Sequence, residues 1–117
     1  MANRMRGEIE AEIGGARRTL CLTLGALAEL ESAFAASDLV ALAERFQNRR
    51  LSARDVLVII ACGLRGAGAQ VSDDEVAAMR VAGGLPAFVR IAADLVAATF
   101  TDGQEAAAPR PPTPQDA

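Results

Sequence analysis

The chain has 117 residues, of which about half are apolar and four are aromatic, all of them Phe. This length suits one domain, and a core of Leu, Val, Ile and Ala is more typical of packed helices than of a β-sandwich. The absence of His excludes catalysis by His and the zinc sites that need it, and a net charge of −3 argues against nucleic acid as a partner.

Residues 7–24 have the pattern of a β-hairpin. From Glu8 to Ile13, Glu alternates with Ile or Ala, and Gly14–Gly15 can adopt the positive φ angles of a two-residue turn. The predicted cross-strand pairs are Ile13 with Ala16, Glu12 with Arg17 as a solvent-facing charge pair, Ala11 with Arg18, Glu10 with Thr19 and Ile9 with Leu20. Arg18 then falls on the apolar face, where its stem must reach water unless the turn is longer. The alternating glutamates are interpreted as a solvated strand face and not as a cation site.

The next stretch changes its apolar period in the middle. Two sets of residues overlap there, namely Leu20, Leu22 and Leu24, and then Leu24, Leu27, Leu30 and Phe34. The first set alternates as in a strand, and the second recurs at helical spacing. Gly25 lies at the change, and a residue without a Cβ allows a sharp corner. We therefore expect a corner at Gly25, followed by a helix over residues 25–36 with Leu24 on its buried face.

Four more helices are predicted, over residues 38–47, 53–65, 73–82 and 85–100. Ser52 and Ser72 each stand three positions before an acidic residue, which is the pattern of a capping box. Glycine stops follow at 66–68 and at 83–84. The helix over 53–65 is apolar almost all round, so we expect it to be the central and most buried one.

We predict one α+β domain over residues 1–102, in which the N-terminal β-hairpin packs on a small bundle of four to five helices. Residues 103–117 hold four of the five prolines and no periodicity, so we expect a disordered C-terminal tail. Cys21 and Cys62 lie in apolar stretches and are expected to be buried thiols. We find no secretory leader and no apolar run of the ~20 residues that span a bilayer, and expect a cytoplasmic protein.

No constellation of residues points to catalysis, to a cofactor or to a metal ion, so we expect a protein that is not an enzyme. The acidic run at 73–75 is explained by its helix cap. Positive charge is concentrated at one junction between predicted helices, where Arg45, Arg49, Arg50 and Arg54 occur. We predict that these arginines contact an acidic partner. The alternative is a solvated helix end, where cations are also favourable.

Several phrases of the sequence resemble the small tail-assembly proteins of gene transfer agents, the phage-like particles of alphaproteobacteria. The phrases are Arg6–Glu8, Arg17–Glu31, Asp38–Phe46, Leu51–Val56, Gly63–Gly68, Val71–Val76 and Gly83–Leu85, in consistent order. The resemblance covers about residues 6–100 and leaves out the tail. Proteins of this family have been described both as tail tube proteins and as tail assembly chaperones.

The resemblance implies a role in building a siphophage-like tail, without catalytic residues or cofactors. A tube subunit needs a β-sandwich or β-barrel whose sheets continue between neighbours, whereas one hairpin and several helices suit a small chaperone better. Such a chaperone holds the apolar face of the tape-measure protein between its helices until tube subunits polymerise around it. The expected partners are therefore the tape-measure protein and tail tube subunits, with self-association left open and with no nucleic acid or membrane. The alternatives are a structural tube subunit of the same particle and an unrelated helical adaptor domain.

Overall fold

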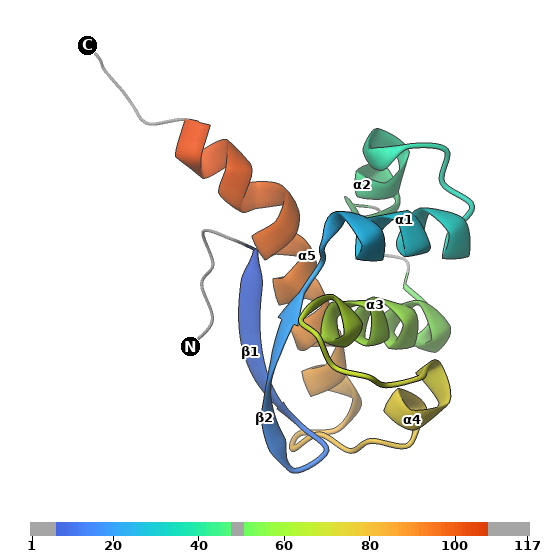
Figure 1. Ribbon diagram of the computed structural model, residues 1–117, viewed down its shortest axis with the longest axis vertical. Coiled ribbons are helices and arrows are strands. Elements are labelled where there is room, and N and C mark those ends of the chain that lie inside the picture. The colour runs from blue at the N-terminus through green and yellow to red at the C-terminus, as the bar shows by residue number, and fades with distance from the viewer. Residues whose placement is uncertain (1–6, 48–50, 108–117) are drawn as a thin grey trace.

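The computed structural model describes residues 7–47 and 51–107, and the side chains of residues 7–47 and 51–100. These ranges form two strands and five helices: β1 (Glu8–Ile13), β2 (Ala16–Cys21), α1 (Leu24–Ala33), α2 (Leu39–Gln47), α3 (Ala53–Gly66), α4 (Asp73–Ala77) and α5 (Leu85–Ala107). Figure 1 shows the hairpin on one side of the molecule with α5 behind it, and α1, α3 and α4 stacked on the other side. The predicted α+β fold, a hairpin packed on a small helical bundle, is confirmed.

The hairpin has the predicted turn and the predicted register. Every expected cross-strand pair is present, from Ile13 with Ala16 to Ile9 with Leu20. Gly14 and Gly15 have φ angles of 64° and 82°, a region that residues with a Cβ rarely adopt. The turn needs no extra residue to accommodate Arg18, because the Arg18 Nε donates a hydrogen bond to the Ile13 carbonyl at 2.8 Å.

The charge pair on the outer face of the hairpin differs from the expected one. Arg17 pairs with Glu10 at 3.0 Å, although its direct cross-strand neighbour is Glu12. Diagonal neighbours lie within reach of a long side chain, and the twist of a two-stranded ribbon brings one diagonal closer. The pairing therefore follows the twist of the hairpin and not the flat register.

The corner between β2 and α1 is made by Thr23, so the expectation of a corner at Gly25 is wrong. The Thr23 hydroxyl accepts a hydrogen bond from the Ala26 amide at 3.1 Å and caps a helix that begins at Leu24. Gly25 lies inside the first turn as a result. Leu24 is 76% exposed, and Ala26 and Leu30 are the buried residues of α1.

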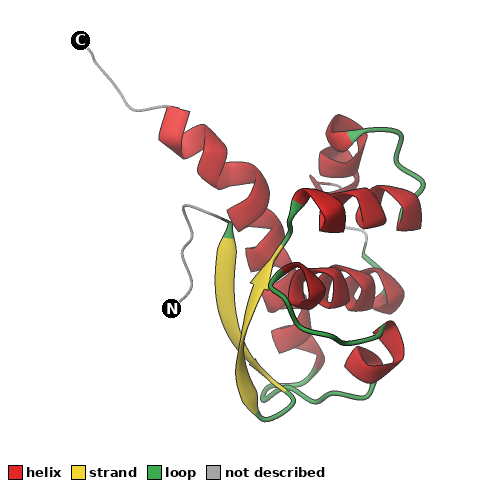
Figure 2. Cartoon of the chain, viewed as in Figure 1, coloured by secondary structure: helices red, strands yellow, loops and turns green. Residues whose placement is uncertain are grey.

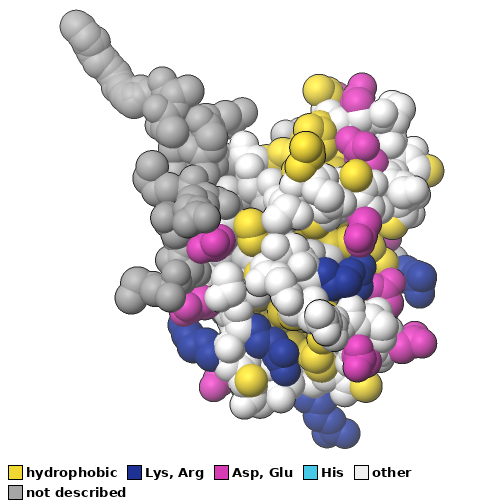
Figure 3. Space-filling model, viewed as in Figure 1, with side chains coloured by type: hydrophobic (Ala, Val, Ile, Leu, Met, Phe, Trp, Pro, Cys, Tyr) yellow, Lys and Arg dark blue, Asp and Glu magenta, His cyan; other side chains and the backbone are white. Residues whose placement is uncertain are grey.

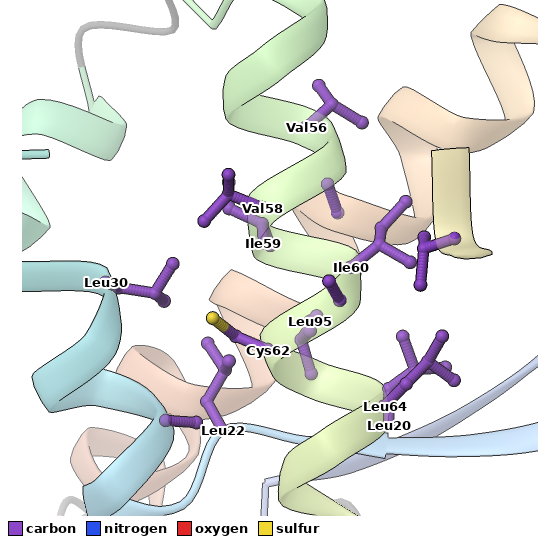
Figure 4. Packing of buried hydrophobic residues seen from close by; sticks show 14 of the residues in the cluster. Leu20, Leu22, Leu30, Val56, Val58, Ile59, Ile60, Cys62, Leu64 and Leu95 are labelled. Carbon is purple, nitrogen blue, oxygen red and sulfur yellow. The ribbon is translucent and has the colours of Figure 1, made fainter. Parts of the chain in front are cut away.

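The centre of the core is α3, as its apolar sequence predicts. Ile59, Ile60 and Leu64 are buried, and side chains from β2, α1 and α5 surround this helix (Figure 4). The predicted capping box is present, since the Ser52 hydroxyl accepts from the Asp55 amide and the Asp55 carboxylate accepts from the Ser52 amide. The same reciprocal bonds join Ser72 and Glu75 at the start of α4.

Two glycines of α3 let the hairpin and α5 approach its backbone closely. A Cβ on Gly66 would collide with the carbonyl of Cys21 in β2, and a Cβ on Gly63 would collide with the side chain of Leu95 in α5. The sequence suggested only a helix stop at 66–68. The helix includes Gly66 and the chain turns away at Gly68, whose φ is 103°. Gly63 and Gly66 are therefore packing residues.

The first three helices end within three residues of their predicted positions, whereas α4 ends earlier. α1 ends at Ala33 instead of residue 36, because Ala35 adopts a positive φ of 54°. α4 ends at Ala77 instead of residue 82. The loop after α4 reaches the hairpin turn, where the carbonyl of Arg80 accepts a hydrogen bond from the Gly14 amide at 2.7 Å. The chain leaves the α-helical path after Ala77, where the Met79 amide bonds to the Val76 carbonyl at 3.0 Å in a tighter turn.

The last helix is longer than predicted. α5 runs to Ala107, whereas the sequence predicted its end at residue 100. Residues 104–107 are Gln-Glu-Ala-Ala, all good helix formers, and the first proline after them is Pro109. Figure 2 shows α5 passing behind the hairpin and extending beyond its open end. The remainder of the predicted tail, 108–117, lies outside the described residues.

Candidate interaction surfaces

A groove with apolar walls lies between α3, α4 and α5, and we call it the apolar groove. Its cavity has a volume of about 250 Å³. The lining side chains are Ala53, Val56, Leu57 and Ile60 of α3, Val76 and Ala77 of α4, and Leu85 and Phe88 of α5. No charged or polar side chain of the described residues lines it, so its only chemistry is contact with hydrocarbon.

The α5 side of the apolar groove carries large hydrophobic residues that reach solvent. Leu85 is 63% exposed and Val89 is 43% exposed. They lie four residues apart and so share one face of α5. Further along α5, Ala92 and Leu95 turn into the core and anchor the helix. The structure thus holds an apolar strip next to the groove on a rigid element.

A second groove, the polar groove, lies between α1 and α3 and has a volume of about 430 Å³. Its lining combines apolar and charged side chains: Glu29, Ser32, Ala33, Phe34, Arg54, Asp55, Val58, Cys62, Arg65 and Asp73. Acidic and basic side chains are interspersed over α3 and α4 on the face seen in Figure 3. The mixture of signs leaves this groove without a single dominant charge.

Arg65 joins three elements at the end of the polar groove. Its guanidinium pairs with Glu29 of α1 at 2.9 Å and with Asp73 of α4 at 3.0 Å. It also donates to the carbonyl of Val71 at 3.3 Å, in the loop before α4. The hydrogen bond from Arg65 is the main reason why the pKa of Glu29 lies below its ordinary value. Arg65 therefore positions α4 against α3.

The Cys62 thiol is an inert part of the same cluster. It is buried and donates a hydrogen bond to the Glu29 carboxylate at 3.4 Å. Burial, followed by this bond, raises the pKa of Cys62 to about 12. A thiol that stays protonated at neutral pH is neither a nucleophile nor a metal ligand. This is consistent with the predicted buried thiol, whereas Cys21 is half-buried.

Of the four predicted contact arginines, Arg54 lines the polar groove, and Arg45 contacts two of its lining residues. Arg45 lies over the ring of Phe34, 5.4 Å from its centroid, and its Nη2 atom is 3.5 Å from the Asp55 carboxylate. Arg54 is exposed on the groove wall. Arg49 and Arg50 lie outside the described residues. The proposal of an acidic partner at these arginines stays a prediction.

Sequence reasoning missed the Arg65 cluster and the apolar groove. Arg65 could have been noticed as the charged residue that directly follows the apolar run from Val56 to Leu64. The apolar groove had no local signal, because Val56, Val76 and Phe88 belong to helices that are distant in the chain. Within the described ranges, no cluster of acidic or Cys side chains is arranged to hold a metal, and no helix is both long and apolar enough to cross a membrane.

A comparison with protein-family models identifies the family of the chain. The model described as "Phage tail tube protein, GTA-gp10" matches residues 6–102. The chain belongs to this family. The match includes the hairpin, all five helices up to the last turn of α5, and every residue that lines the two grooves. It confirms the resemblance to gene transfer agent tail proteins that the sequence phrases suggested. Searches of curated proteins and of solved structures found no match.

Proposed function

We propose that this member of the tail family is a tail assembly chaperone that binds the tape-measure protein in the cytoplasm while the tail is built. Membership of the family supports a role among tail components. The proposed chemistry is reversible burial of the apolar face of the client protein, without catalysis or a cofactor.

The observation that carries this proposal is the small amount of sheet. The described residues contain one sheet of two strands. The inner face of this sheet is packed against the helices through the buried side chains of Ile9, Ile13 and Leu20. A tube wall of stacked rings needs sheets that continue from subunit to subunit. Most of the described chain is helical instead, with apolar side chains exposed on α5. Such a surface suits transient contact with an amphipathic client.

A structural tube subunit is the second candidate, and the description of the family as tail tube proteins favours it. The two candidates differ in where the protein is found at the end of assembly. A tube subunit stays in the finished particle in many copies, whereas a chaperone leaves before the particle is complete. An unrelated helical adaptor is disfavoured by the family membership.

The test has two measurements on the full chain. The first is co-expression with the tape-measure protein of the same gene cluster, followed by purification of the tagged chain. The second is mass spectrometry of purified particles. We expect the tape-measure protein to become soluble and to co-purify, and the chain to be absent from particles. Insoluble tape-measure protein together with stoichiometric chain in particles would establish the tube subunit instead.

A further inference from the structure

The apolar groove and its solvent-exposed edge have the properties of a docking site for a helix. The lining consists of hydrocarbon side chains from three helices. The edge formed by Leu85 and Val89 lies in water, although residues of this size are normally covered. The cavity of about 250 Å³ is too small for a whole helix, whose diameter with side chains is about 10–12 Å. It suits the side chains on one stripe of a helix that lies across the rim.

The charge next to the groove selects among such helices. α4 begins with three acidic residues, Asp73, Asp74 and Glu75. Asp73 is neutralised by Arg65, and the Glu75 carboxylate accepts the Ser72 amide at 2.7 Å. Asp74 is exposed and makes no ion pair or side-chain hydrogen bond with another described residue. It lies three positions before the lining residue Ala77, on the same side of α4.

We propose that the apolar groove binds an amphipathic helix with Lys or Arg beside its apolar stripe, and that this helix belongs to the tape-measure protein. The identity of the helix rests on the proposed function, whereas its chemistry rests on the groove. The apolar stripe inserts between α3 and α5 and covers Leu85 and Val89. The basic flank lies over α4 and pairs with Asp74.

The first experiment measures binding of labelled helical peptides to the full chain. One peptide carries Leu at positions i, i+3, i+4 and i+7 with Lys beside them, and a matched peptide carries Glu in place of Lys. We expect tighter binding of the Lys peptide. The substitution Leu85→Asp should weaken it at least about tenfold, because it places a charge in the apolar contact. Leu85 and Val89 are both exposed, so Leu85→Asp and Val89→Asp leave the core intact.

Matched control variants are available on other parts of the surface. Leu24 and Val40 are 76% and 68% exposed and lie outside the groove. Leu24→Asp and Val40→Asp should change the affinity by less than about twofold. Asp74→Lys should reverse the preference, so that the Glu peptide binds more tightly. Wild-type affinity of Leu85→Asp, equal loss in Leu24→Asp, or an unchanged preference in Asp74→Lys would each overturn the proposal.

The second experiment separates the groove from the proposed function. The tape-measure protein is co-expressed with the wild-type chain, with Leu85→Asp and with Leu24→Asp. Solubility with the wild type and Leu24→Asp but not with Leu85→Asp supports both proposals. Solubility with all three keeps the chaperone function and overturns the groove as its site. Insolubility even with the wild type overturns the function, and the peptide measurements then decide the groove alone. A wild-type dimer that Leu85→Asp converts to a monomer would assign the groove to a second copy and overturn the proposal.

Discussion

At the scale of single residues, space around the backbone decides what a glycine does. Gly25 and Gly66 both lie in helices, where glycine costs about 1 kcal/mol relative to alanine. Near Gly25, the closest atom to an added Cβ is the Thr23 hydroxyl at 3.9 Å. Near Gly66, an added Cβ meets the backbone carbonyl of Cys21, which cannot rotate away as a side chain does.

The substitutions Gly25→Ala and Gly66→Ala should therefore have opposite effects. Gly25→Ala should raise the free energy of unfolding by up to about 1 kcal/mol, since it gains helix propensity without a clash. Gly66→Ala should lower it by more than about 2 kcal/mol, because α3 and β2 must separate. Urea unfolding followed by far-UV circular dichroism measures both. Equal stabilisation by the two substitutions would show that the close approach of α3 and β2 is absent.

The Cys62 thiol should react slowly in the folded protein. Its pKa is raised to about 12 by burial and by the bond to Glu29, so the thiolate that attacks a disulfide reagent is scarce near pH 8. In a Cys21→Ala background, we expect modification at least about tenfold slower than in the unfolded chain. The absorbance of the released thiolate from an aromatic disulfide reagent follows the reaction. Denaturant should restore the full rate, and a fast reaction without it contradicts the buried position.

At the scale of elements, side-chain caps and one guanidinium determine where helices begin and how they are held. Thr23, Ser52 and Ser72 each satisfy an amide at a helix start. α4 has five residues, too few to be stable alone. It is held by the buried side chain of Val76 and by Arg65. Since Val76 and Ala77 line the apolar groove, Arg65 is a positioning residue for one wall of that groove.

The pair between Arg65 and Glu29 should make stability depend on pH in the acid range. The pKa of Glu29 is lowered from its ordinary value of 4.5 in the folded state, mainly by the hydrogen bond from Arg65. The contribution of ionised Glu29 to the free energy of unfolding is therefore complete above about pH 4.5. It is lost as the pH falls through the pKa that Glu29 has in the folded state, which is lower. Glu29→Gln should cost at most about 1 kcal/mol near pH 7, because the Glu29 side chain is 55% exposed and screened by solvent.

The measurement compares the unfolding free energies of the wild type and Glu29→Gln at about pH 7 and about pH 3. We expect the difference between them to shrink at the lower pH. Glu12→Gln is the matched control, since Glu12 is an exposed carboxylate outside the Arg65 cluster. A difference that stays constant or grows on acidification would mean that the pair does not stabilise the fold.

At the scale of the whole molecule, one core joins the hairpin to the helices. Leu20 of β2, Gly63 of α3 and Leu95 of α5 meet at its centre. A two-stranded hairpin is marginal in water by itself. Its stability therefore comes from α3 and α5, and these helices in turn need the hairpin to cover them. We therefore expect all the elements around this centre to unfold cooperatively.

Leu20→Ala and Leu24→Ala test this cooperativity with the same chemical change four residues apart. Leu20 is completely buried, so its truncation should cost about 2–5 kcal/mol. Leu24 is 76% exposed, and its truncation should stay within about 0.5 kcal/mol. Hydrogen exchange should show that Leu20→Ala lowers protection equally in the hairpin, α3 and α5. Protection lost in the hairpin alone would mean that the hairpin unfolds independently.

Patterns that are local in the chain were predictable from the sequence alone. The register of the hairpin followed from the alternation of residues 8–13 and from the two glycines of the turn. The two capping boxes and the central position of α3 followed from short motifs and from one apolar run. These features depend on backbone preferences within a few residues, and each carries its own signal.

The tertiary structure alone decided the features that join distant segments. The loop after α4 is bonded to the hairpin turn through the Arg80 carbonyl and the Gly14 amide, and the role of Gly66 depends on the carbonyl of Cys21. The apolar groove and the Arg65 cluster likewise combine residues from three elements each. The physical reason is that a cap or a turn is satisfied by its own neighbours. A groove, an ion-pair cluster or a close backbone approach exists only when packing has brought separate elements together.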